Sequence, residues 1–392
     1  MSIRPGLWIG LLVLNGIVAL AAEPQTAKQW HSEAILKEMT GDLRGAIADL
    51  DRAIALDPKN WLLYAPRAQD KSELGDLAGA IADFTQIIAL VPDDKRRAMF
   101  HEKRAHVRSL TGDYSGALAD YDQSLKLDEY SDTYNNRGLA RNRSGNQAGA
   151  LEDLDKAISL KPTSPRYLVN RASIRQKQGD LTGAAKDFDR AVEIAPKNYG
   201  VYVRRGDFRR SQEDLEGAAA DYTKAIEGGS DFAEGYLSRA MIRQAQGKWE
   251  AAVADYDLAV KAMEPDSQEP VPYREIALRQ LGRGTPPAEL AKLATDWEDN
   301  WITMTVRFLA GTVSESDLLA HARKDEDQRG QIPQSLALYF AGMFRLQAGD
   351  AATARKYFEQ HLTLKIPDSI EGTLVRAELA RLAKQPPAAP AK

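Results

Sequence analysis

The stretch HEKRAH, residues 101–106, comes nearest in this chain to a metal-binding motif. In the zinc-binding pattern His-Glu-x-x-His, two histidines four residues apart bind the metal from one face of a helix. His101 and His106 are five residues apart, which places them about 140° apart around a helix. They cannot share a metal ion from one face, so we predict no metal site here.

The rest of the chain offers no clearer pattern for catalysis or cofactor binding. His31, His321 and His361 are isolated, and no Ser-His-Asp arrangement has a recognisable local signature. The stretch GRGTP, residues 282–286, lacks the lysine and the serine or threonine of a phosphate-binding loop. The absence of cysteine excludes disulfides, thiol nucleophiles, cysteine-bound metals and a lipidated N-terminal cysteine. We therefore predict no catalytic residues and no cofactor.

The composition is that of a globular protein without a nucleic-acid partner. Of the 392 residues, 43% are hydrophobic and 28% are charged, and the net charge is −4. The 52 basic and 56 acidic residues are well mixed. Nucleic-acid-binding proteins instead cluster their basic charge, so we predict that this chain does not bind nucleic acid.

Residues 1–22 have the layout of a cleaved signal peptide. Arg4 precedes an apolar run over residues 7–20, and Ala-Leu-Ala at 19–21 provides a small-residue cleavage site. The alternative is an uncleaved membrane anchor, but the run is shorter than the ~20 residues of a spanning helix. We predict a periplasmic or secreted protein of bacterial type, with N-terminal membrane anchoring as the alternative.

A pattern of about 34 residues recurs through the first two thirds of the chain. GDLRGAIADLDRAIALDP at 41–58 returns as GDLAGAIADFTQIIALVP at 75–92. Each repeat has an anchor, usually glycine, then alanine five residues later and a large apolar residue nine residues later. The seven anchors are Gly41, Gly75, Gly112, Gly145, Gly179, Glu213 and Gly247; the alanines are Ala46, Ala80, Ala117, Ala150, Ala184, Ala218 and Ala252; the large residues are Leu50, Phe84, Tyr121, Leu154, Phe188, Tyr222 and Tyr256.

We predict that each repeat forms two antiparallel helices. Helix A ends at the anchor, which takes a left-handed conformation, and helix B ends before a proline such as Pro58 or Pro92. Helices of ~12–14 residues are marginal alone in water, but stacked repeats bury their apolar faces together. Small residues on helix A should face the alanines of helix B; they are Ala34, Ala68, Ala105, Gly138, Ala172, Gly206 and Ala240.

The period, the Ala-x3-aromatic spacing and the closing prolines resemble the tetratricopeptide repeat (TPR). The resemblance covers about residues 27–266. It implies an all-α fold, a right-handed superhelical solenoid of antiparallel helix pairs. The remaining chain is expected to add an irregular helical insert and a C-terminal capping helix. The predicted segments are a signal peptide at 1–22, seven repeats at 23–266, an irregular helical segment at 267–334, a last repeat with its capping helix at 335–384, and a disordered tail at 385–392.

A charge pattern runs through the repeats. An arginine stands eight residues before each anchor except the first, where Glu33 takes its place, and an aspartate stands eight residues after each anchor. If pairs formed within a repeat, Glu33 would repel Asp49. We therefore predict a structural ladder between repeats, with pairs such as Asp49–Arg67 and Asp187–Arg205. Its members are Asp49, Arg67, Asp83, Arg104, Asp120, Arg137, Asp153, Arg171, Asp187, Arg205, Asp221, Arg239 and, in the seventh repeat, Asp255.

The C-terminal part of the chain has a second resemblance. Trp301 with VRFLAG, and ALYFAGMFRLQAGDAATARKYFEQ from 337 onward, resemble the C-terminal part of the bacterial repeat lipoprotein NlpI family. That family implies a non-catalytic adaptor of the cell envelope that acts with cell-wall hydrolases and a protease and can dimerise. The present sequence has more repeats and no lipobox cysteine, so the family's membrane anchoring is not implied. The aromatic-rich segment 335–384 is expected to seal one end of the solenoid or to form a homodimer face.

These observations predict a protein–protein interaction scaffold of the cell envelope. Its partners would be cell-wall enzymes, proteases, or secretion and assembly factors. The alternative is an enzyme whose site lies in 267–334, around Asp296, Glu298 and Asp299.

In TPR stacks helix A lines the ligand groove, so residues beside its packing face should bind a protein segment with some acidic character. The predicted groove residues are Asn135, Leu139, Asn142, Arg143, Arg166, Val169, Ser173, Gln176, Lys177, Val203, Asp207, Arg210, Leu237, Met241 and Gln244.

Overall fold

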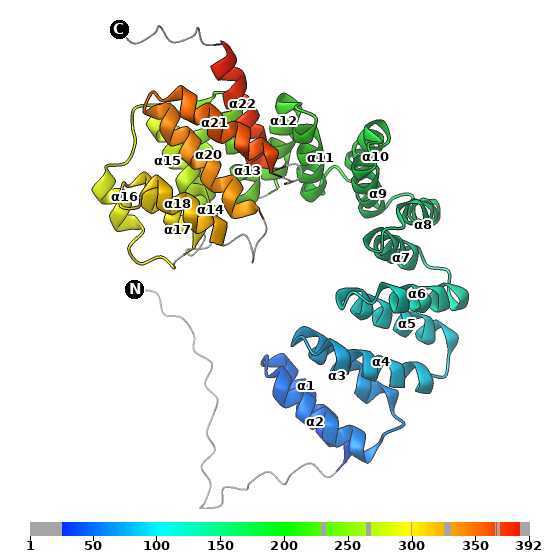
Figure 1. Ribbon diagram of the computed structural model, residues 1–392. Helices are drawn as coiled ribbons and strands as arrows, with labels where there is room; N and C mark the ends of the chain where they lie inside the picture. The colour runs from blue at the N-terminus through cyan, green and yellow to red at the C-terminus, as the bar shows by residue number, and fades with distance from the viewer. Residues whose placement is uncertain are drawn as a thin grey trace, which may run out of the picture. The chain divides into compact units, whose positions relative to one another are not determined.

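The computed structural model describes residues 26–228, 233–263, 268–298, 300–324, 331–364, 366 and 369–384. Within these ranges the regular structure is entirely helical, in agreement with the predicted all-α class (Figure 1). No helix in the same ranges is long and apolar enough to cross a membrane. The predicted signal peptide at 1–22 and tail at 385–392 lie outside the described residues.

The chain divides at Pro162 into an N-terminal and a C-terminal unit, each with its own packing. The described part of the N-terminal unit consists of helical hairpins, one for each of the first four repeats (Figure 1). In each hairpin the first helix is helix A and the second is helix B. The helices are α1 (Ala27–Met39), α2 (Leu43–Leu56), α3 (Trp61–Glu73), α4 (Leu77–Leu90), α5 (Asp94–Leu110), α6 (Tyr114–Leu127), α7 (Ser131–Arg143) and α8 (Gln147–Leu160).

The C-terminal unit begins with three more hairpins and continues as a bundle. The hairpins are α9 (Pro165–Lys177) with α10 (Leu181–Ile194), α11 (Tyr199–Ser211) with α12 (Leu215–Ile226), and α13 (Ala233–Ala245) with α14 (Trp249–Ala262). The bundle contains α15 (Pro270–Gln280), α16 (Pro287–Leu293), α17 (Trp301–Leu309), α18 (Glu315–Lys324), α20 (Ile332–Gln347), α21 (Ala351–Thr363) and α22 (Ile370–Lys384).

Six of the seven hairpins turn through the same two residues, a left-handed anchor followed by an Asp or Asn that caps helix B; in the seventh, Lys248 follows the anchor and makes no side-chain cap. Gly75 has φ +84°, a left-handed conformation that glycine adopts without steric cost, and it ends α3. The next residue, Asp76, caps α4 by accepting a hydrogen bond from the Gly79 N–H at 2.9 Å. The other anchors also have positive φ, and Glu213 does so at φ +62° although it is not glycine. The predicted left-handed helix ends are therefore confirmed.

Small residues set the distance between the two helices of a hairpin, as the sequence predicts. Ala172 of α9 and Ala184 of α10 are fully buried in one cluster with Phe188. At Gly206 a Cβ atom would lie 2.9 Å from the ring of Tyr222, so no larger residue fits there without movement. The spacing of small and large residues is thus the packing interface of the hairpin.

The bundle of the C-terminal unit shares one continuous core with the last repeats. Tyr256 of α14 stacks on Tyr273 of α15 with ring centroids 6.4 Å apart, and Tyr273 packs on Phe340 of α20 at 4.9 Å. Tyr339, Phe340 and Phe358 of the segment 335–384 have no exposed surface. These three aromatic side chains therefore pack inside their own chain and offer no surface to a homodimer face, which stays a prediction.

The charge ladder exists, but its predicted direction is wrong. Arg67 donates two hydrogen bonds to Asp83 of its own repeat, at 2.9 and 2.5 Å, and not to Asp49 of the repeat before it. Likewise Arg205 pairs with Asp221 at 2.6 Å instead of Asp187. The same intra-repeat pairing joins Arg104 to Asp120, Arg137 to Asp153, Arg171 to Asp187 and Arg239 to Asp255.

In the first repeat a lysine replaces the missing arginine. Lys37, four residues after Glu33, forms an ion pair with the buried Asp49 at 2.5 Å. A cation occupies this position, four residues before the anchor, in every repeat. From the second repeat on, it is a second cation beside the arginine. These residues are Lys37, Lys71, Arg108, Arg141, Arg175, Arg209 and Arg243, and each pairs with the ladder aspartate of its own repeat.

Contacts between repeats use a different acceptor. Arg67 also donates to Asp51, which lies two residues beyond the predicted partner Asp49, at 2.5 Å. Arg137 reaches Asp122 and Arg205 reaches Asp189 in the same way, at 2.7 and 2.9 Å. These acceptors are half exposed, whereas the ladder aspartates are buried. The arginines therefore stabilise the hairpin first and the stacking of neighbouring repeats second.

Candidate protein-binding grooves

A cavity of about 510 Å³ lies on the surface that the A helices of the N-terminal unit form. We call the surface formed by the A helices of either unit its helix-A face. Helices α3, α5 and α7 provide its walls, and Phe84 of α4 contributes to its floor. The residues that line it are Gln69, Ser72, Phe84, Met99, Glu102, Lys103, His106, Val107 and Asn136. We call this the N-terminal groove.

The N-terminal groove combines an apolar contact surface with hydrogen-bonding groups. Met99 is 42% exposed, which is high for a large apolar side chain. Glu102 accepts a hydrogen bond from Asn136 at 2.8 Å. Burial raises the pKa of Glu102 above its usual value, and the nearby Asp132 carboxylate adds to this effect. The groove therefore offers a flexible thioether, an amide and a carboxyl group within one cavity.

A second cavity continues the N-terminal groove along α5. It measures about 680 Å³ and shares Met99 and Glu102 with the first cavity. Its other lining residues include Lys95, Arg96 and Tyr130. An extended groove of this kind suits a peptide segment better than a small ligand.

The two histidines near the zinc-like motif point to different neighbours. His101 contacts the ladder carboxylate Asp120 through Nδ1 at 3.0 Å, whereas His106 lines the groove. Among the described residues, no group of three or more His, Asp or Glu side chains is arranged to hold a metal ion.

The residues predicted for α7 lie outside both cavities. Asn135 is buried and donates to Asn136 at 3.0 Å. Leu139 and Asn142 are half-buried and Arg143 is exposed. The N-terminal groove is instead lined by Asn136 of α7 and by residues of the second and third repeats, where Gln69, Ser72, Glu102 and His106 stand at the same distances before their anchors. The positional pattern that predicts groove residues in repeats four to seven therefore also marks those of the second and third repeats.

On α9 of the C-terminal unit, the predicted groove residues do not line a common cavity. Arg166 and Lys177 are exposed. Val169 packs against the core cluster of Phe188, and Ser173 accepts a hydrogen bond from Arg204 at 3.2 Å. Gln176 donates to Ser211 of α11 at 3.0 Å, which joins two neighbouring A helices.

The predicted residues of α11 and α13 do come together. Val203, Asp207, Arg210, Leu237 and Met241 line one cavity of about 530 Å³. We call this the C-terminal groove. Its remaining lining residues, which the sequence analysis does not predict, are Glu234, Ser238, Met263, Glu269 and Ile370.

Two residues predicted beside an open groove, Arg210 and Gln244, are buried instead. Arg210, expected beside an open groove, is only 7% exposed and donates to Thr373 of α22 at 3.4 Å. Gln244 is fully buried and accepts a hydrogen bond from Tyr256 at 2.7 Å. Helix α22 packs on α13 as well as on α21, so it covers part of the helix-A face in addition to closing the chain end.

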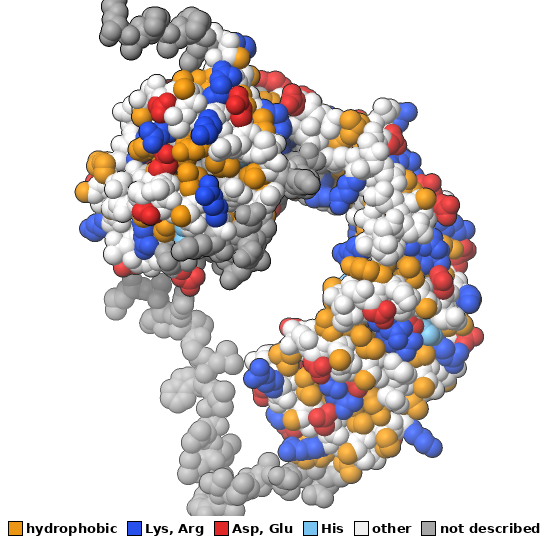
Figure 2. All heavy atoms as spheres, in the orientation of Figure 1, with side chains coloured by type: hydrophobic (Ala, Val, Ile, Leu, Met, Phe, Trp, Pro, Cys, Tyr) orange, Lys and Arg blue, Asp and Glu red, His pale blue; other side chains and the backbone are white. Residues whose placement is uncertain are grey.

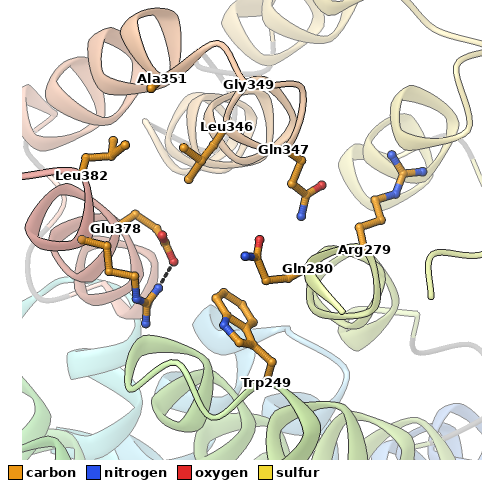
Figure 3. Close-up of a pocket in the computed structure, with 10 residues that line it drawn as sticks. Trp249, Arg279, Gln280, Leu346, Gln347, Gly349, Ala351, Glu378 and Leu382 are labelled. Carbon is orange, nitrogen blue, oxygen red and sulfur yellow. Dashed lines mark hydrogen bonds and ion pairs between the residues drawn. The ribbon is translucent and has the colours of Figure 1, made fainter. Parts of the chain in front are cut away.

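A third cavity, of about 450 Å³, lies between α14, α15, α20, α21 and α22 (Figure 3). Trp249, Gln280 and Gln347 point toward its centre. Its cations are already engaged, because Arg279 binds Glu275 and the Leu309 carbonyl, while Arg381 binds Glu378 and two carbonyls of α13. This cavity therefore offers less to a charged ligand than its two arginines would suggest.

Basic and acidic side chains are mixed on the face seen in Figure 2, and neither sign dominates that face. Lysine and arginine side chains alternate with aspartate and glutamate over both units in this view. The absence of a nucleic-acid partner stays a prediction.

Comparison with known families decides the nature of the repeats. One tetratricopeptide-repeat model matches residues 103–165 and 201–270, and a second matches residues 165–198. The fold is an all-α TPR fold. No curated protein matches the chain. The resemblance of the C-terminal part to the NlpI family stays a prediction.

Several solved TPR structures are similar to this chain at low sequence identity. A TPR protein from Parabacteroides merdae is 22% identical, with a TM-score of 0.50, over 64% of this chain and 98% of its own. The C-terminal part of a TPR protein from Cytophaga hutchinsonii is 19% identical, with a TM-score of 0.46, over 61% and 97%. YrrB, described as a TPR protein with an unusual peptide-binding site, is 20% identical, with a TM-score of 0.36, over 48% and 95%.

Proposed function

We propose that this protein is a non-catalytic scaffold of the bacterial cell envelope that binds segments of other proteins on its helix-A faces. TPR proteins generally mediate protein–protein interactions, and the N-terminal groove is the observation that carries the proposal for this chain. An exposed methionine can seat apolar side chains, and amides such as Gln69 and Asn136 can pair with a peptide backbone. The location in the envelope rests on the predicted signal peptide.

The partners remain those that the sequence analysis predicts: cell-wall enzymes, proteases, or secretion and assembly factors. The enzymatic alternative, a site in 267–334, stays a prediction. Asp296 and Glu298 are exposed between α16 and α17 and line none of the cavities described above, and Asp299 lies outside the described residues. Self-association through 335–384 stays a prediction, which sedimentation of the full-length protein tests.

Site-specific photo-crosslinking in cells that export the protein tests the proposal. A crosslinking amino acid at Gln69 is compared with one at Leu160, which lies on helix B and is 42% exposed. We expect protein adducts from Gln69 only, identified by mass spectrometry. The substitution Met99→Glu should remove them, while Leu160→Glu, a change at equal exposure, should not. Equal adducts from both sites, or none from Gln69, would contradict binding in this groove.

A further inference from the structure

The C-terminal groove has an apolar floor. Val203, Leu237, Met241, Met263 and Ile370 bring aliphatic or thioether side chains to one cavity, and these come from α11, α13, the end of α14 and the start of α22. Leu237 and Met241 are nearly buried, so they are already held by the core and present a preformed surface. Methionine side chains adapt their shape to an incoming apolar group at little cost.

The rim of the same cavity is acidic. Asp207, Glu234 and Glu269 line it, and Arg210 is the single basic residue among its lining residues. The Arg210 side chain is buried against Thr373, so its charge does not project from the rim into solvent as the sequence analysis expected.

The carboxyl groups of this rim influence one another. Burial raises the pKa of Glu269 above its usual value, and the nearby carboxylates of Glu371 and Glu234 raise it further. Glu371 itself accepts a hydrogen bond from Tyr273 at 2.7 Å. A cation placed at this rim would relieve the repulsion among these groups, whereas an anion would increase it.

We propose that the C-terminal groove binds a protein segment in which an apolar side chain lies next to lysine or arginine. The apolar side chain enters between Met241 and Ile370, and the cation meets Glu234 and Glu269 at the rim. This inference rests on the proposed scaffold function and replaces the expected acidic ligand for this groove. Complementary charge selects the partner, while burial of the apolar side chain supplies most of the affinity.

Two matched synthetic peptides test the inference on the full-length protein. One is a fluorescein-labelled amphipathic 15-residue peptide of leucine and lysine, and the other has glutamate in place of every lysine. We expect the lysine peptide to bind by fluorescence anisotropy, with affinity that falls as salt rises. The double variant Glu234→Gln/Glu269→Gln should weaken its binding about tenfold. The matched control, Glu250→Gln/Glu359→Gln, removes the same charge at two exposed positions outside the groove and should leave the affinity unchanged.

The outcomes separate this inference from the function on which it rests. Equal binding of both peptides, or equal weakening by the control variant, overturns the charge selectivity but leaves groove binding intact. If neither peptide binds while Gln69 still gives adducts, the C-terminal groove is not a site for such segments and the scaffold function stands. If Gln69 also gives none, both proposals fail. Thermal unfolding of each variant shows whether a loss of binding reflects a loss of fold.

Discussion

Arg171 and Asp187, sixteen residues apart in one repeat, are joined by two hydrogen bonds of 2.9 and 2.6 Å. The Asp187 carboxylate also accepts from Arg175 at 2.8 Å, and it is only 3% exposed. Two cations on helix A therefore neutralise one buried carboxylate on helix B. Because a buried carboxylate without a cation is costly, this arrangement ties the two helices of the hairpin together.

A double-mutant cycle can measure that pairing. Arg171→Ala should destabilise the protein by about 2 kcal/mol, less than the ~3–5 kcal/mol typical of a broken buried pair, because Arg175 still contacts Asp187. Combining Arg171→Ala with Asp187→Ala should show coupling of at least ~1 kcal/mol in denaturant unfolding. The control cycle pairs Asp187→Ala with Arg205→Ala, and its coupling should be near zero, since Arg205 binds Asp221. Strong coupling in the control cycle would support the inter-repeat pairing that the structure contradicts.

The direction of this ladder could have been predicted from one overlooked residue. Glu33, which stands where arginine is expected, favours pairing between repeats when it is considered alone. Lys37, four residues later and on the same helix face, supplies the cation in that repeat. A second cation at this position recurs in every repeat, so the periodicity that revealed the hairpins also contained the information needed to pair the charges.

Other features could not be read from periodicity. The repeat positions predict the hairpins, their left-handed turns and their packing interface, because these contacts are local. The contact of Arg210 with Thr373 joins residues 163 positions apart, and no repeated spacing marks it. The position of α22 over part of the helix-A face is therefore visible only in the structure, although the sequence predicts a capping helix within 335–384.

Glu213 is the one non-glycine anchor, and its replacement by glycine should stabilise the protein. The left-handed conformation at φ +62° costs a non-glycine residue about 1–2 kcal/mol. Glycine would remove that cost and lose the ion pair of Glu213 with Arg376 at 3.1 Å. Both side chains of that pair are substantially exposed, so the pair contributes only ~0–1 kcal/mol. We expect Glu213→Gly to raise the Tm, and Arg376→Ala, which removes only the ion pair, to change it little. A lower Tm for Glu213→Gly would show that the ion pair matters more than the backbone strain.

Asp70 of α3 should make the N-terminal unit less stable as pH rises. Burial, together with the carboxylates of Glu38 and Glu73, raises the pKa of Asp70 to about 6. A carboxyl group with a raised pKa in the folded state binds its proton more tightly there than in the unfolded chain. Its contribution to stability is therefore complete below about pH 4 and is lost as pH rises through about 6.

The substitution Asp70→Asn tests this pH dependence. It should stabilise the protein at pH 7.5 by an amount on the order of 2 kcal/mol and have little effect at pH 4. Asp76→Asn, in the same repeat, is the control, because asparagine caps a helix as well as aspartate does. Denaturant unfolding at both pH values gives the comparison. Parallel pH profiles for Asp70→Asn and the wild type would show that Asp70 titrates normally.

Arg381 should determine whether α22 stays on α13. Its guanidinium donates to the carbonyls of Gln244 and Ala245 at 2.9 and 2.6 Å and pairs with Glu378. It also lies over the Trp249 ring, with its Cζ 5.2 Å from the ring centroid. The Glu378 side chain is 5% exposed, so it depends on this cation. Arg381→Ala would leave a buried carboxylate and two helix-end carbonyls without their donor.

We expect Arg381→Ala to cost about 3–5 kcal/mol and to increase hydrogen exchange across α22 more than in the hairpins of the N-terminal unit. Lysine should rescue only part of the loss, because it cannot form the same set of planar contacts. The double variant Glu378→Leu/Arg381→Leu should recover much of it, since an apolar pair of similar volume removes the buried charge. Exchange in α22 that is unchanged by Arg381→Ala would show that the apolar contacts of Leu374 and Val375 hold the helix without the arginine.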